Sequence, residues 1–311
     1  MNIEKLLLKA LLPGIPANGV GLVKNVEVRK TKNGAEFLSG VITDGDTSMN
    51  FKKWQARQED KDTIVAGKGI MLIAGEVTEY QGMHEIKISK YSILPEEEVA
   101  ALDLIPKADI SIDKLNEEWE THLDALMSAG YDMKSIVDFL EKANLISAYK
   151  TYAGAKSVHH DYQYGLLEHV TNTASIAMDI CRNVSYPINT GVVRFAALFH
   201  DIGKIQCYQF VNNLATDISK DFVLQGHLYA GANLISKLRK WIPEGDVEGI
   251  IHCILSHHDK PEWGAIVPPA TMEARIVASA DLISSMIPVY KPEKEVVRPV
   301  YVASLGHSVI R

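Results

Sequence analysis

Apolar and polar residues alternate in short runs along the N-terminal part of the chain. Asn33-Gly34, Asp44-Gly45 and Gln81-Gly82 separate these runs, and Asn-Gly or Asp-Gly between apolar runs is a strong turn signal. A polar stretch, 55–66, lies between the third and fourth runs and is compatible with a helix. Five short strands with a helix after the third have the plan of an OB-fold barrel, although the pattern alone also fits another small barrel or a sandwich. The expected strands cover 20–28, 37–42, 49–54, 70–77 and 85–93.

After Pro95 the apolar residues recur at helical spacing instead. Pro187, Pro243, Pro268-Pro269 and Pro288 fall between the amphipathic segments, where helices are expected to end. The pattern therefore predicts an α+β protein in which an N-terminal barrel is followed by an all-α domain. The expected helices cover 115–127, 133–149, 166–183, 190–199, 227–241, 247–257 and 271–286.

The change of pattern sets the expected domain boundaries. We expect an OB-fold nucleic-acid-binding domain over 1–95, a linker over 96–110, a helical domain over 111–290 and a tail over 291–311. The tail has no pattern that assigns it to a helix or a strand.

Composition limits the class of protein. Of the 311 residues, 47% are hydrophobic and 23% are charged, which is typical of a globular protein and excludes a mostly disordered chain. No apolar run reaches the ~18 residues that a membrane span needs, so no membrane partner is expected. The interrupted apolar stretch 6–12 is too short for a secretory signal. Three scattered cysteines without CxxC spacing favour reduced thiols and a cytoplasmic protein.

Charge is distributed unevenly along the chain. The net charge is −7, yet the segment 17–95 carries 11 Lys/Arg against 10 Asp/Glu, and the excess of acid lies in the helical part. A near-neutral barrel with local basic stretches remains compatible with a nucleic-acid partner, because the position of charge matters more than its sum.

Side chains that bind metals are concentrated in the helical part, on or at the ends of expected helices. Helices can direct such side chains into a common core, and imidazole with carboxylate suits Mn, Fe, Co, Ni or Zn, with enough groups here for two ions. A single buried histidine is more often a hydrogen-bonded core residue than a ligand. The apolar run 196–199, however, ends in His200-Asp201, a costly polar pair that a metal would satisfy. The candidate ligands are His169, His200, Asp201, His227, His257, His258 and Asp281.

The residues around these positions carry a resemblance. The order His169, His200-Asp201, Asp281, with Ala-Leu-Phe-His-Asp-Ile-Gly-Lys around the doublet, resembles the HD-domain superfamily of metal-dependent phosphohydrolases. The segments 155–160, 165–169 and 256–264, together with the barrel, are similar to the YhaM-type 3′→5′ exoribonucleases, which join an OB-fold to an HD domain. This resemblance covers roughly 18–287.

The resemblance implies a metal-dependent exonuclease acting from the 3′ end of single-stranded RNA, with DNA as an open alternative. It assigns His169, His200, Asp201 and Asp281 to one ion, with Asp201 as a candidate bridge to a second ion held by His227 and His257; His258 is either a further ligand of that ion or a contact to phosphate. Manganese is the preferred ion. Gly165 stands where some trinuclear relatives carry Glu, which favours two ions, and Ser284 stands where the family often has a second acid.

Further residues are candidates for catalysis and substrate binding. Asp201 and Lys204 are the catalytic candidates, because Lys204 lies one helical turn after Asp201 and can direct its ammonium at phosphoryl oxygens; a solvated lysine is the alternative. His159 and His160 either contact substrate or have a local structural role. Trp263 either stacks on a base or packs under the site.

In the barrel, the candidate contacts to a nucleic acid are basic and aromatic residues in the first turn and at the end of the third strand. Binding of single strands needs a basic groove and exposed aromatic rings, whereas solvated lysines and buried rings are the alternative. Acidic loops nearby predict modest affinity. The candidates are Arg29, Lys30, Lys32, Phe37, Lys53 and Trp54.

Three functions fit the sequence. The first is the exonuclease, which the basic first hairpin of the barrel favours. The second is an HD phosphohydrolase acting on a nucleotide or cyclic dinucleotide, with the barrel as a regulatory or assembly module. The third is a nucleic-acid-binding factor with a structural metal, which so many polar ligands together with a lysine disfavour. The sequence leaves open whether the chain forms a homo-oligomer.

Overall fold

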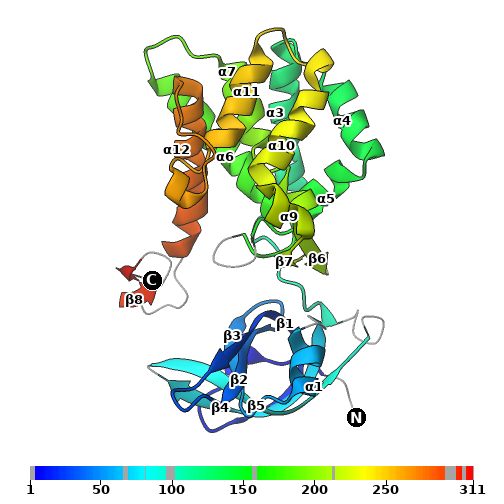
Figure 1. The fold of residues 1–311 in the computed structure, drawn as a ribbon, viewed down its shortest axis with the longest axis vertical. Coiled ribbons are helices and arrows are strands. Elements are labelled where there is room, and N and C mark those ends of the chain that lie inside the picture. The colour runs from blue at the N-terminus through cyan, green and yellow to red at the C-terminus, as the bar shows by residue number, and fades with distance from the viewer. Residues whose placement is uncertain are drawn as a thin grey trace. The chain divides into compact units, whose positions relative to one another are not determined.

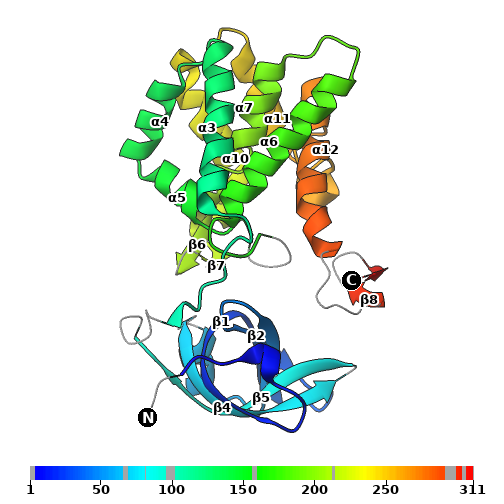
Figure 2. The same ribbon diagram turned by 180° about the vertical axis from the view of Figure 1, so that it is seen from behind.

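The computed structural model describes residues 4–65, 69–80, 82–95, 102–155, 160–211, 214–290, 299–302 and 306–310. The chain folds as two compact units, Met1–Lys107 and Ala108–Arg311, and each has a hydrophobic core of its own. Figures 1 and 2 show the strands of the first unit in blue to cyan and the helices of the second in green to orange.

The first unit is a closed β-barrel with the strand order β1-β2-β3-β5-β4. β3 pairs with β5 in parallel, and β1 closes the barrel by pairing with β4 in an antiparallel register. This arrangement confirms the OB-like barrel expected from the turn signals. The strands are β1 (Pro16–Lys30), β2 (Glu36–Thr43), β3 (Ser48–Lys53), β4 (Ile70–Tyr80) and β5 (Met83–Ile93).

The barrel interior is filled by the alternate side chains of its strands. Phe51 is 1% exposed and belongs to this core, and a Cβ on Gly40 would lie only 2.8 Å from its ring. The polar stretch after β3 forms α1 (Gln58–Asp60) and a π-helical turn, η2 (Lys61–Val65). Ile64 of η2 is buried with the barrel core, so the turn covers that core as the helix of the expected plan would.

The second unit is a bundle of helices with a short hairpin between α8 and α9. Side-chain oxygens of Ser111, Asp132, Asn189 and Thr271 accept hydrogen bonds from backbone amides three residues on and begin α3, α4, α7 and α12. The longer helices are α3 (Ile112–Ser128), α4 (Met133–Lys142), α5 (Leu145–Thr151), α6 (Gly165–Asn183), α7 (Thr190–Phe199), α10 (Gly226–Lys237), α11 (Asp246–Ser256) and α12 (Met272–Met286). The shorter elements are η1 (Leu8–Ala10) in the first unit and α8 (Lys204–Cys207), α9 (Lys220–Leu224), β6 (Tyr208–Val211), β7 (Leu214–Ile218), η4 (Arg239–Trp241), η5 (Pro261–Trp263), η6 (Ile287–Tyr290), β8 (Pro299–Val302) and β9 (His307–Ile310) in the second.

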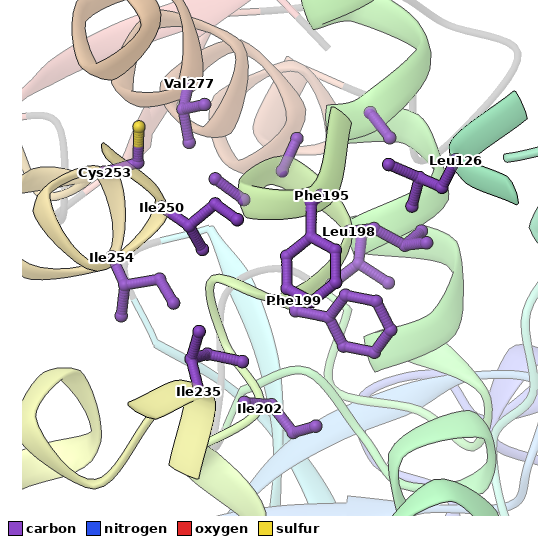
Figure 3. Packing of buried hydrophobic residues seen from close by; sticks show 14 of the residues in the cluster. Leu126, Phe195, Leu198, Phe199, Ile202, Ile235, Ile250, Cys253, Ile254 and Val277 are labelled. Atoms are coloured by element: carbon purple, nitrogen blue, oxygen red, sulfur yellow. The ribbon is translucent and has the colours of Figure 1, made fainter. Parts of the chain in front are cut away.

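Helix α7 lies at the centre of this bundle. It packs against α3, α6, α11 and α12, and its residues from 195 to 199 are wholly buried. Figure 3 shows the rings of Phe195 and Phe199 in the middle of the cluster, with Ile250 of α11 on one side and Leu126 of α3 on the other. Because the last turn of α7, residues 195–199, is apolar on all sides, it is fully buried, and the residues that follow it begin inside the protein.

Two expectations differ from the structure. The pattern predicts one helix over 133–149, but α4 ends at Lys142 and α5 begins at Leu145, because Asn144 between them adopts a left-handed conformation with φ of 55°. The hairpins β6-β7 and β8-β9 were not expected, the second lying in the tail. Among the described residues, no helix is both long and apolar enough to cross a bilayer.

Candidate metal centre

The His200-Asp201 pair follows the last turn of the buried helix α7. His200 is the C-cap of α7, and both residues are at most 2% exposed. The hydroxyl of Tyr149, itself buried, donates to the carbonyl oxygen of Leu198 at 2.9 Å and supports this turn. The chain then enters α8 with Lys204. The burial of α7 is therefore what brings a charged side chain to the interior.

Two of the candidate ligands are oriented by backbone carbonyls of their own helices. Nδ1 of His200 lies 2.8 Å from the carbonyl oxygen of Ala197, and Nδ1 of His257 lies 2.8 Å from that of Ile254. A carbonyl only accepts, so each Nδ1 carries a proton and each Nε2 presents a lone pair. Donation from the second ring nitrogen to a backbone carbonyl is how metal-binding histidines are commonly held.

The first group of ligand atoms joins α6, α7 and α12. Nε2 of His169 lies 3.2 Å from Nε2 of His200 and 3.1 Å from Oδ1 of Asp281, and one ligand atom from each of the three residues lies within 4.8 Å of the others. Two ring nitrogens facing each other at this distance repel unless a proton or a cation lies between them.

The second group joins α10 to the end of α11. Ligand atoms of His227, His257 and His258 lie within 4.8 Å of one another. Asp201 stands between the two groups: its Oδ2 is 3.3 Å from Nε2 of His200, and its Oδ1 is 3.5 Å from Nε2 of His227. Each carboxylate oxygen thus faces a different group, as a bridging ligand would.

Several buried polar atoms of the site lack hydrogen bonds. In the described part of the chain, Oδ1 of Asp201, Nε2 of His257 and Nδ1 of His258 have no hydrogen-bond partner. Buried acceptors without partners are costly and rare in native proteins. A divalent cation would satisfy such acceptors together, so the donor set fits a metal centre.

The protonation of the site also suits a cation. Burial lowers the pKa of His227 to about 3 and lowers the pKa of His257 well below its usual value, which leaves both imidazoles neutral at pH 7. Burial by itself raises the pKa of Asp201, but Lys204 and His200 lower it more, so this carboxyl is ionised. Burial by itself also raises the pKa of Asp281, but the neighbouring imidazoles of His169 and His200 lower it more, so this carboxyl is ionised as well.

Lys204 is held in place by two contacts. Its Nζ lies 2.7 Å from Oδ2 of Asp201 and donates to the carbonyl oxygen of Gly154 at 2.8 Å. Although burial by itself lowers the pKa of Lys204, the charge of Asp201 outweighs it and raises the pKa overall, so the amine is protonated. Lys204 therefore brings a fixed positive charge to the ligand cluster.

Five of the seven candidate ligands and Lys204 form part of the wall of one cavity. Its volume is about 210 Å³, and ligands from both groups line it together with Lys204. Trp263 stands at its edge with 54% of the residue exposed, and Nζ of Lys260 lies 4.6 Å from the centre of the indole ring. The lining residues are His169, Asp201, Lys204, His257, His258, Asp259, Trp263, Ala278, Asp281, Leu282 and Ser285.

Comparison with known proteins agrees with this site. The family model described as "HD domain" matches residues 166–286. Residues 166–286 are an HD domain. This matched stretch contains the seven candidate ligands and Lys204, so the ligand cluster and the family assignment point to the same part of the chain.

Curated relatives resemble both units of the chain. The 3'-5' exoribonuclease YhaM of Oceanobacillus iheyensis is 27% identical over 295 residues, covering 91% of this chain and 88% of the relative. The protein of the same name from Halalkalibacterium halodurans is 26% identical over 292 residues, covering 89% of this chain and 86% of the relative. These relatives confirm the resemblance to YhaM-type proteins that the HD motif and the barrel indicated.

One solved structure is similar to the barrel. The second OB-fold domain of replication protein A from Methanococcus maripaludis is 19% identical and covers 27% of this chain and 88% of its own, with a TM-score of 0.22. A score this low carries no argument, and the OB-like fold is identified here by the strand order alone.

Of the two neighbouring histidines before the HD domain that the sequence suggested as substrate contacts, the structure describes one. His160 is 1% exposed, and its ring centre lies 5.1 Å from that of His169. The structure therefore places His160 beside His169. His160 is not among the described residues that line the cavity. His159 lies outside the described residues.

The candidate contacts on the barrel divide into two sets. The rings of Phe37 and Trp54 stack with centres 4.6 Å apart. Arg29 and Lys30 form ion pairs with Glu27 at 2.9 Å and Glu36 at 3.9 Å, respectively. Lys32 is exposed at the same turn, and Lys53 is half-buried. The structure thus brings the two aromatic candidates together and offsets part of the basic charge of the hairpin.

Two further residues of the barrel, both visible in the sequence as candidates, extend the aromatic pair, whereas sequence reasoning gave no role to Tyr149 and Gly154. Nζ of Lys52 lies 5.7 Å from the ring centre of Trp54 and 4.5 Å from that of Tyr80, so both extend the aromatic pair. Their signals were the lysine pair 52–53 at the end of the expected third strand and an aromatic residue shortly after the fourth. The roles of Tyr149 and Gly154 depend on contacts between distant segments and have no such signal.

Proposed function

We propose that this protein is a metal-dependent 3′→5′ exoribonuclease that hydrolyses the phosphodiester bonds of single-stranded RNA. The observation that carries the proposal is the convergence of seven histidine and aspartate side chains within an HD domain, five of which line one cavity. The relatives named 3'-5' exoribonuclease YhaM, which align with about nine tenths of this chain, supply the substrate class and the polarity of cleavage.

The donor set suits two divalent ions. His169, His200 and Asp281 would hold one, His227, His257 and His258 the other, and Asp201 would contact both. Divalent ions in such a site supply Lewis acidity, neutralise phosphate charge and activate water as a nucleophile. Imidazole and carboxylate ligands suit Mn²⁺, the preferred ion here, and also Co, Fe, Ni or Zn.

The chain's own residues bind and orient the phosphodiester. The ammonium of Lys204 lies in the cavity wall with its charge fixed by Asp201 and Gly154, so it can bind a phosphoryl oxygen and stabilise negative charge that develops there. Trp263 offers an exposed ring at the edge of the cavity, where the terminal base can stack. A cavity of about 210 Å³ is smaller than a typical site for a drug-sized ligand. This size suits the terminal nucleotide of a single strand and not a duplex.

The barrel offers a second contact to the same strand. Phe37, Trp54 and Tyr80 with the ammonium of Lys52 form a surface of aromatic rings and positive charge, which we call the aromatic platform. Bases of any sequence stack on such surfaces, and backbone phosphates are attracted to the lysine. This arrangement supports binding of single strands without sequence preference.

A time course on a 5′-labelled single-stranded RNA tests the function. Wild-type protein with Mn²⁺ should shorten the strand from its 3′ end, and EDTA or the Asp201→Asn variant should abolish the products. Lys204→Met should lower kcat by about 10²- to 10³-fold, because it removes one preorganised positive charge. The bound metal should be counted in each protein by elemental analysis.

An intact RNA strand with a metal-loaded wild-type protein would contradict the exoribonuclease. Products that shorten from the 5′ end, or internal fragments, would contradict the polarity. In the first case nucleotides and cyclic dinucleotides are the substrates to test next, with the same Asp201→Asn control.

A further inference from the structure

Both ring nitrogens of His169 are contacted by a single turn of α12. Oδ1 of Asp281 lies 3.1 Å from Nε2, and Oγ of Ser284 lies 3.0 Å from Nδ1. Asp281 and Ser284 are three residues apart, so they share one face of the helix. Ser284 is 3% exposed and is not among the described residues that line the cavity. It therefore contacts His169 from the protein interior and not from the cavity.

The hydroxyl of Ser284 has one proton, and a backbone carbonyl oxygen beside it can only accept that proton. Oγ donates to the carbonyl oxygen of His169 at 3.3 Å, a carbonyl that also accepts from Oγ1 of Thr173 at 2.8 Å. A carbonyl oxygen has no proton to give, so Oγ of Ser284 is left as an acceptor towards Nδ1. This arrangement favours a proton on Nδ1 of His169, with the lone pair of Nε2 directed towards Asp281 and His200.

His169 differs in this respect from the other oriented ligands. His200 and His257 donate from Nδ1 to carbonyls of their own helices, which no side-chain substitution removes. For His169 the acceptor is a side chain from a distant helix, 115 residues away in sequence. The partner that favours the metal-binding tautomer of this ligand is therefore a side-chain hydroxyl that a substitution can remove.

We infer that Ser284 is a positioning residue that holds His169 in the metal-binding tautomer and so sets the affinity of the first metal position. Without the hydroxyl, Nδ1–H loses this acceptor, and the ring can instead place its proton on Nε2, 3.1 Å from the carboxylate of Asp281. A protonated Nε2 cannot bind a metal. The inference rests on the metal centre of the proposed function and not on the identity of the substrate.

The test measures binding of Mn²⁺ alone to the metal-free full-length protein by calorimetry. Loss of such an orienting partner typically weakens metal binding 10- to 100-fold, and we expect a loss of about this size in Ser284→Ala. Ser284→Cys keeps the shape of the side chain with a weak acceptor and should lose affinity in the same direction. Ser284→Thr keeps the hydroxyl and should restore affinity to near that of wild type.

Two controls separate positioning from folding. Ser279→Ala removes a hydroxyl from the same helix that donates only to the carbonyl of Arg275, and it should bind Mn²⁺ as wild type does. The thermal midpoint of each metal-free variant shows whether it is folded, and the Cys variant decides the question if the Ala variant is not.

Three results would overturn the inference. Affinity within twofold of wild type in folded Ser284→Ala or Ser284→Cys would show that the hydroxyl has no such role. Equal loss in folded Ser284→Thr would assign the effect to packing, and no Mn²⁺ binding by wild type would remove the metal centre itself. Weakened binding in a protein that cleaves no RNA would contradict only the proposed exoribonuclease, so the two proposals fail separately.

Discussion

A single histidine outside the metal centre shows how burial and partners decide protonation. His122 of α3 is 5% exposed, and its Nδ1 lies 2.7 Å from Nη1 of Arg194, which can only donate. The proton of the neutral ring is therefore on Nε2, 3.2 Å from Oγ of Ser175. Burial, and then the charge of Arg194, lower the pKa of His122 to about 4. Its environment suits only the neutral form.

Replacing this histidine should change the pH dependence of stability. Because the folded-state pKa of about 4 lies below the ordinary value of 6.5, the unfolded chain binds more protons between these values. The stability that neutral His122 contributes is thus present above pH 6.5 and is lost as the pH falls towards 4. His122→Gln keeps an acceptor and a donor without this titration, and should lose less stability over that range.

The measurement is the thermal midpoint of the metal-free protein between pH 7.5 and 4.5. We expect the acid-induced decrease to be smaller in the variant by about 1 kcal/mol or more, or ~2–4 °C in a unit of this size. Parallel curves for the two proteins would show that His122 does not contribute. The histidines of the metal centre are present in both proteins, so their titration cancels in the comparison.

At the scale of elements, the close contact of α10 with the His200-Asp201 turn sets the distance between the two ligand groups. A Cβ on Gly203 would lie 2.0 Å from the carbonyl oxygen of His227 and 2.6 Å from the backbone nitrogen of Gly231. No side chain fits there without moving the backbone of α10. The approach of His227 to Asp201 therefore requires glycine at position 203 for reasons of space.

Gly203→Ala should separate α10 from this turn. We expect destabilisation of about 1–3 kcal/mol from overpacking and loss of roughly half of the bound metal, because His227 moves away from Asp201. The measurements are the thermal midpoint and the metal content by elemental analysis.

Gly249→Ala is the matched control, since its Cβ on α11 would meet only Val192 at an ordinary 3.4 Å. This change should stabilise the protein by about 0.5–1 kcal/mol through helix propensity. Equal metal content in wild type and Gly203→Ala would contradict the close-contact explanation.

At the scale of the whole molecule, each unit has its own core and its own candidate surface. The HD domain carries the polar cluster in a cavity, and the barrel carries the aromatic platform. Trp54 is 37% exposed and stacks on Phe37, so it is available to a base. In the proposed function, the two tasks of holding a strand and cutting it therefore fall to separate units.

Trp54→Ala should weaken binding of single-stranded RNA without affecting the metal centre. Loss of one stacking ring typically costs about 1–3 kcal/mol, so we expect about 5- to 100-fold weaker binding. The measurement is fluorescence anisotropy with labelled RNA and the full-length protein, with Asp201→Asn as the background so that the RNA stays intact.

Tyr186→Ala, which removes a ring that is 70% exposed on the helical unit, is the control and should bind RNA unchanged. Unchanged affinity in Trp54→Ala, with the control behaving as expected, would remove the aromatic platform from the proposed function.

The sequence by itself determined the order of elements and the identity of the ligands. Turn residues such as Asn33-Gly34, the alternation of apolar positions and the helical spacing after Pro95 are local signals, and the observed strands and most helices follow them. The His200-Asp201 pair after an apolar helix indicated a metal site because a buried polar pair needs compensation.

The tertiary structure alone decided how these residues act together. Phe51 lies inside the barrel and Trp54 stays half-exposed, although both are aromatic residues of the same expected strand. The place of Asp201 between two ligand groups and the contact of Ser284 with His169 depend on how distant helices cross, which no local pattern encodes. Periodicity determines which face of an element is buried, whereas only packing determines which atoms of different elements meet.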